Sequence, residues 1–109
     1  MNAPAEEVYL VYITAANAEE ASTLGRALVE KRLAACVNVI PALRSFYWWE
    51  GKLVEDEEAL LLAKTFSSRL PQLMEAVRSL HSYSVPAISA LPVAHLNPAY
   101  RQWMEEVLG

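Results

Sequence analysis

The 109-residue sequence contains a single cysteine, Cys36. One thiol excludes disulfides within the chain, and it excludes a zinc site built from several thiolates of one chain. No positively charged and then apolar leader stands at the N-terminus. Because structural disulfides are typical of oxidising compartments, we expect a cytoplasmic protein.

Basic residues are also scarce, since 9 Lys and Arg stand against 13 Asp and Glu and give a formal net charge of -4. Nucleic-acid-binding domains typically carry a basic patch, and none is visible here. No apolar run is long enough to cross a bilayer. We therefore expect neither a nucleic-acid partner nor a membrane partner, whereas the negative charge favours cations.

Glycine is rare, with 3 residues, while 54% of the sequence is hydrophobic. This composition excludes a disordered chain, and the length suits one domain with its own core. We expect a loose tail over residues 1–6 and a single domain over residues 7–109.

The most informative segment runs from Ala34 to Thr65, where two limbs rich in β-branched and aromatic residues flank Glu50-Gly51. Gly51 supplies the positive φ that a short hairpin turn needs. Limbs of about fifteen residues span about 50 Å, whereas a chain of this size has a radius of gyration of about 13 Å. The hairpin should therefore overhang its domain and expose the aromatic residues 46–49. Exposed apolar patches mark partner surfaces, so this arm is predicted to drive oligomerisation.

The hairpin register can be counted from the turn. It places Trp49 opposite Lys52, Arg44 opposite Glu57 and Cys36 opposite Thr65. Pro41 has no backbone N–H and is tolerated only at an edge or a bulge. Beyond Pro41 the register is therefore open to a slip of one residue.

The remaining elements complete an α+β pattern. Asn17 is a predicted N-cap for a helix over residues 18–32, and Asn97 with Pro98 begins a last helix. Between them, Ser67 or Ser68 caps a helix whose apolar stripe is Leu70, Leu73, Val77 and Leu80. With strands over residues 8–13 and 87–91, the order is β-α-β-β-α-β plus a C-terminal helix. This order predicts a ferredoxin-like fold with a long central hairpin and both crossover helices on one face.

Few residues suggest chemistry, and each has a structural alternative. Cys36 is either a small buried side chain or a metal ligand, because thiolate and imidazole together suit copper or zinc. His81 follows a helix C-terminus, where it either satisfies carbonyl groups or binds metal. Lys64 is either an anion contact or a solvated lysine. No nucleophile stands with an oriented base, so we expect no enzyme.

Several motifs together resemble the CutA family of divalent-cation tolerance proteins. They cover essentially residues 8–107 and comprise Arg32 to Asn38, Pro41, Tyr47, Trp49, Gly51, Lys64-Thr65, His81, Tyr83, Leu91 to Val93 and Trp103. The resemblance implies a ferredoxin-like homotrimer, similar in architecture to PII signalling proteins, with a link to copper and other divalent cations. It also places the family's cysteine and histidine at Cys36 and His81.

Departures from the family pattern occur at Ser82, Ser84 and Ala87, and again at His95 and Leu96. The absence of a carboxylate at Ala87 weakens any site that depends on one there. His95 offers an imidazole that the family commonly lacks.

Three hypotheses follow from these residues. The first is a trimer that binds copper(II) or another divalent cation through Cys36 and His81. The second is a PII-like sensor trimer that binds a small anion between subunits, with Lys64 and Tyr83 as contacts. The third is a structural trimer that acts as an interaction scaffold.

Overall fold

The computed structural model describes residues 6–109, which form a four-stranded antiparallel sheet with the strand order β2-β3-β1-β4. The elements are β1 (Val8–Ala15), α1 (Ala18–Glu30), β2 (Cys36–Trp49), β3 (Lys52–Phe66), α2 (Leu70–Leu80), β4 (Ile88–Pro92) and α3 (Pro98–Leu108), with a 3-10 turn (Ser67–Arg69) before α2. This arrangement confirms the predicted α+β, ferredoxin-like fold with a C-terminal helix. None of the helices within residues 6–109 is long and apolar enough to span a bilayer.

Most of the tail predicted over residues 1–6 lies outside the described residues. Its last residue, Glu6, is held in place by two long-range hydrogen bonds. The backbone N–H of Ser68 donates to a Glu6 carboxylate oxygen at 2.9 Å, and the Arg101 guanidinium donates to the Glu6 carbonyl at 2.6 Å. The domain is therefore anchored from Glu6 onward.

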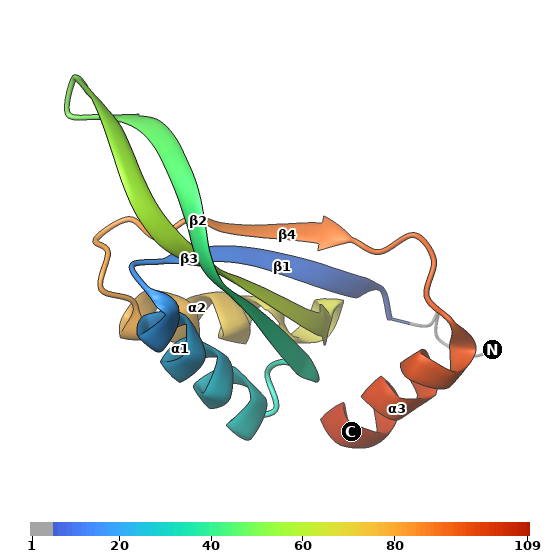
Figure 1. The fold of residues 1–109 in the computed structure, drawn as a ribbon. Helices are drawn as coiled ribbons and strands as arrows, with labels where there is room; N and C mark the ends of the chain where they lie inside the picture. Colours follow the sequence, from blue (N-terminus) through green and yellow to red (C-terminus); the bar gives the residue numbers. More distant parts are fainter. Residues whose placement is uncertain (1–5) are drawn as a thin grey trace.

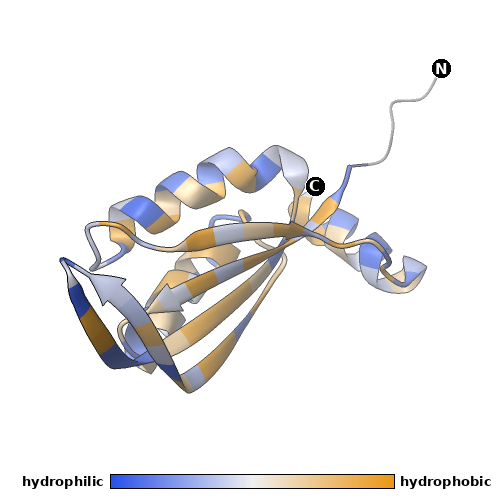
Figure 2. Cartoon of the chain, turned by 90° about the horizontal axis from the view of Figure 1, so that it is seen from above, coloured by the Kyte–Doolittle hydropathy of each residue, from blue (hydrophilic) through white to orange (hydrophobic). Residues whose placement is uncertain are grey.

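Helices α1 and α2 lie on one side of the sheet (Figure 1). The main core joins them to the sheet and includes Val11, Ile13, Leu24, Leu28, Ala59, Leu61, Ala63, Leu73 and Val77. Gly25 allows this close approach, because a Cβ atom there would lie 2.7 Å from Cγ1 of Val37. In Figure 2 hydrophilic and hydrophobic residues alternate along the helices, as expected when one side of a helix packs on a core and the other faces solvent.

The helix ends agree only in part with the expected caps. The Asn17 side chain accepts a hydrogen bond from the Glu20 backbone N–H at 2.8 Å, which confirms the predicted N-cap of α1. Neither predicted serine caps α2, which follows the 3-10 turn and has no side-chain cap. Leu80, predicted in the apolar stripe, is the last residue of α2 and is 47% exposed.

Within residues 6–109, the opposite sheet face is covered only at one end. There α3 packs Met104 and Leu108 against Val8 and Phe66 in a second apolar cluster. On the part of this face that α3 does not cover, every second residue of each strand points away from α1 and α2. Tyr12, Ile40 and Leu91 are among them, and each is more than a third exposed. This surface, hereafter the open sheet face, gives the central strand β1 an uncovered side.

The β2–β3 hairpin extends far beyond the other elements (Figure 1). The chain measures 54 Å along its longest axis, with a radius of gyration of 15.1 Å. Glu50 and Gly51 at the turn have φ values of 49° and 76°, as a type I′ hairpin turn requires. The overhanging arm predicted from the sequence is thus present.

A β-bulge interrupts the hairpin between Ile40 and Leu43, where Pro41 made a slip of register expected. On the turn side, Arg44 lies opposite Glu57 as predicted, although its ion pair is with Glu55. Past the bulge the register is shifted by one. Cys36 therefore lies opposite Lys64 and not opposite Thr65, as counting without a bulge had predicted.

Candidate functional site

Cys36 lies at the start of β2, on the open sheet face and only partly buried. Its thiol is 3.9 Å from the side-chain oxygen of Asn38, at the outer limit of a hydrogen bond to sulfur. The shifted register sets it directly across from Lys64. The structure therefore brings together two residues that the sequence singled out separately.

Lys64 is half-buried against α3. Its Nζ donates to the Tyr100 hydroxyl at 3.5 Å and lies 5.2 Å from the centre of that ring. Burial and a hydrogen bond with Cys36 raise the pKa of Tyr100 to about 12, so the phenol stays protonated at neutral pH. Tyr100 lies in the last helix that the sequence predicted, but the sequence did not single it out as a site residue. Its role beside Lys64 depends on how α3 folds back, which no local pattern reveals.

His81 is buried at the C-terminus of α2, and the backbone engages both of its ring nitrogens. Nδ1 accepts from the Tyr83 N–H at 3.0 Å, so Nε2 carries the proton and donates to the Thr14 carbonyl at 2.7 Å. The nearby Glu20 carboxylate accepts from the backbone N–H groups of Ala16 and Ser82. In this arrangement the imidazole links α2 to the end of β1.

The candidate metal ligands Cys36 and His81 are far apart within the chain. Cys36 is aligned through Lys64 with Leu10 of β1, whereas His81 contacts Thr14. Leu10 and Thr14 are four residues apart on β1, which separates the two candidate ligands by about 13 Å along the strand direction. Within residues 6–109, no group of three or more His, Cys, Asp or Glu side chains is placed to hold a metal ion. One chain alone therefore does not assemble the predicted donor set.

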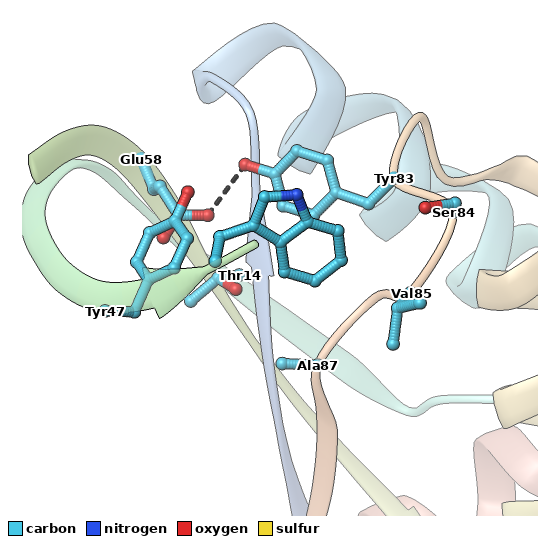
Figure 3. Close-up of a pocket in the computed structure, with 8 residues that line it drawn as sticks. Thr14, Tyr47, Glu58, Tyr83, Ser84, Val85 and Ala87 are labelled. Atoms are coloured by element: carbon cyan, nitrogen blue, oxygen red, sulfur yellow. Dashed lines mark hydrogen bonds between the residues drawn. The ribbon is translucent and has the colours of Figure 1, made fainter. Parts of the chain in front are cut away.

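Tyr83, the second candidate for ligand binding, lies in a different place from Lys64. It lines a cavity of about 470 Å³ between the hairpin arm, the end of β1 and the segment that joins α2 to β4. The lining residues are Thr14, Tyr47, Trp49, Glu58, Tyr83, Ser84, Val85 and Ala87. In Figure 3 the Tyr83 ring points across the cavity toward Glu58, with Val85 and Ala87 on the other side. We call this cavity the arm pocket.

Glu58 is the buried charge of the arm pocket, with 6% of its surface exposed. It accepts a hydrogen bond from the Tyr83 hydroxyl at 2.7 Å, and Tyr47 donates to Asp56 at 3.4 Å (Figure 3 shows the first of these bonds). Burial and the two carboxylates raise the pKa of both phenols above the usual range, so both remain protonated donors. Residues 55–58 are all acidic, and the sequence did not show that Glu58 is the member turned inward.

Comparison with known proteins gives a consistent result. The family model described as CutA1 divalent ion tolerance protein matches residues 9–107. The chain is 52% identical over 104 residues to the divalent-cation tolerance protein CutA of Thermus thermophilus, an alignment that covers 95% of this chain and 99% of the relative. It is 49% identical over 100 residues to protein CutA of Mus musculus, where the alignment covers 92% of this chain but 56% of the mouse protein.

Solved structures agree with the sequence comparison. The periplasmic divalent cation tolerance protein CutA from Archaeoglobus fulgidus superposes with a TM-score of 0.91 at 36% identity, covering 94% of this chain and 99% of that one. The divalent cation tolerance protein from Thermus thermophilus gives a TM-score of 0.89 at 50% identity, with the same two coverages. From the family match, the sequence relatives and the shared fold, the chain belongs to the CutA family of divalent-cation tolerance proteins.

Proposed function

We propose that the protein acts as a homotrimer that binds divalent cations, with copper(II) as the first candidate ion. The observation that carries the trimer is the apolar surface of the arm. Phe46, Trp48 and Leu53 share one face of it and are 64%, 73% and 63% exposed. Apolar area of this kind is costly in water and is stabilised by burial against another chain.

The open sheet face supports the same proposal. Tyr12, Ile40 and Leu91 lie on strands whose other face is packed by helices. Strands β2 and β4 are also the two edges of the sheet, and edges with unpaired backbone groups readily meet other chains. A closed ring of three copies would cover both features, and a closed assembly leaves no apolar face free for further growth.

Divalent-cation binding is supported by the names of the relatives, which link them to cation tolerance. Because the described part of one chain offers no three-ligand group, we propose that the ion is bound by groups from more than one copy. Cys36 is the candidate ligand that the open sheet face presents to a neighbour. His81 binds an ion only if its ring gives up the hydrogen bond to Thr14 or to Tyr83. We propose no catalytic role, and a cytoplasmic location stays a prediction from the sequence.

A second candidate, a sensor that binds a small anion, is favoured by one observation. Lys64 is half-buried on the open sheet face, and among the described residues no carboxylate lies within 4.0 Å of it. A lysine in that position offers an uncompensated positive charge to an anion held against a neighbouring chain.

Light scattering on the protein at micromolar concentration should give three times the 12.1 kDa mass of one chain. Trp48 and Leu53 are a cross-strand pair, so Trp48→Asp/Leu53→Asp places two carboxylates on the same exposed face and should shift the protein toward monomer. The variant Ser22→Asp/Thr23→Asp adds the same charge to exposed positions of α1 and should assemble normally. A monomeric wild type would contradict the trimer, and full assembly of the arm variant would contradict the role of Trp48 and Leu53 in it.

A copper(II) titration at neutral pH should show weaker binding, by about tenfold or more, in Cys36→Ala or in His81→Ala than in the wild type, since loss of one ligand weakens a small site strongly. His95→Ala is the control, because it removes an exposed imidazole outside the proposed site. Light scattering on each variant checks that assembly is intact. Equal affinity in all four proteins would remove both residues and leave surface binding alone.

For the anion candidate, inorganic phosphate is the simplest probe. Lys64→Met keeps most of the side-chain volume and removes the charge, so phosphate should bind this variant more weakly than it binds the wild type. Lys31→Met removes an exposed lysine at the end of α1 and should change nothing. If phosphate binds the Lys64 variant and the wild type equally, the sensor hypothesis loses its positively charged contact.

A further inference from the structure

The arm pocket combines three aromatic side chains with one buried carboxylate. Tyr47 and Trp49 come from β2, Tyr83 comes from the segment between α2 and β4, and Glu58 comes from β3. The rings of Tyr47 and Trp49 lie on the same face of the arm as Glu58 because the bulge at Pro41 shifts β2 by one residue. Without that shift, alternate positions of β2 would turn both rings to the other face of the arm.

The charge of the arm pocket is not balanced within the described part of the chain. Among residues 6–109, no Lys, Arg or His forms an ion pair within 4.0 Å of Glu58 or of Asp56. Among the side chains that the structure describes, the neutral phenol of Tyr83 is the one hydrogen-bond partner of Glu58, and the phenol of Tyr47 is that of Asp56. A carboxylate that is 6% exposed and lacks a counter-charge gains stability from any cation that reaches it.

The residues that line the arm pocket determine which kind of cation can bind there. Divalent metal ions need several oxygen or nitrogen ligands, and no such group converges among residues 6–109. The faces of Trp and Tyr rings attract ammonium groups through their quadrupoles, and aromatic cages of this kind bind alkylated ammonium ions. Val85 and Ala87 add an apolar side, and a volume of about 470 Å³ is in the range of small-molecule sites.

We propose that the arm pocket binds a small organic cation, with its ammonium group against Tyr47, Trp49 and Tyr83 and with Glu58 as the counter-charge. This site differs from the proposed metal and anion contacts. Glu58 and Lys64 are six residues apart on β3, which separates them by about 20 Å. The inference therefore uses none of the metal or anion contacts of the proposed function, and it has its own test.

The test compares choline with 3,3-dimethyl-1-butanol, a neutral molecule of the same shape, in calorimetric titrations of the assembled wild-type protein. Choline should bind at least about tenfold more tightly, because the ion contact of its ammonium group with Glu58 and the cation–π contacts are both absent from the alcohol. Binding should also change the tryptophan fluorescence, since Trp49 lines the pocket.

Two matched variants locate the site. Glu58→Gln keeps an acceptor for the Tyr83 hydroxyl but removes the charge, and it should weaken choline binding by about tenfold or more. Glu57→Gln changes the net charge equally at the neighbouring exposed position, on the other face of the arm, and should bind choline as the wild type does. If choline does not bind, if the alcohol binds equally well, or if Glu58→Gln retains full affinity, the proposal is overturned. The comparison of the two ligands on the wild type decides the question even if Glu58→Gln does not fold.

Discussion

The pairing of β2 with β3 is the interaction on which the rest of the structure depends. It runs from Cys36 opposite Lys64 to Trp49 opposite Lys52, broken only by the bulge after Ile40. On the sheet side of the bulge it forms part of the packed domain. On the turn side the same two strands leave the domain and carry apolar side chains into solvent. One register shift therefore sets both the neighbours of Cys36 and the direction of every aromatic ring on the arm.

The β2–β3 pair therefore carries two separate candidate binding regions, one on each side of the bulge. At one end Cys36, Lys64 and Tyr100 gather where α3 folds over the sheet, on a surface open to another chain. Where the arm faces the end of β1 and the segment before β4, Glu58 and three aromatic rings enclose a negative, largely apolar cavity. Metal or anion binding is proposed for the first region and organic-cation binding for the second. His81 belongs to neither region in the isolated chain, because its ring links the end of α2 to β1.

Local patterns predicted the order of the elements, the cap at Asn17, the turn at Glu50-Gly51 and the length of the arm, since each depends on residues near one another in the chain. Pro41 also marked where the register breaks, because a missing N–H is a local property. The arm pocket was not predicted, because it needs Thr14, Glu58 and Tyr83 from three distant segments, and no local pattern separated the buried Glu58 from the exposed Asp56 two residues before it. The state of His81 was equally hidden, because its acceptor is the carbonyl of Thr14, 67 residues away.

The central claim is that other copies of the chain cover the arm. Beyond the bulge the arm is only two strands wide, and an isolated two-stranded hairpin is marginally stable in water. Residue-resolved amide hydrogen exchange on the wild-type protein tests this claim most directly. The account predicts that arm amides over residues 43–49 and 53–57 exchange nearly as slowly as those of the central strand β1. Exchange in the arm as fast as in an exposed loop, with β1 still protected, would contradict it.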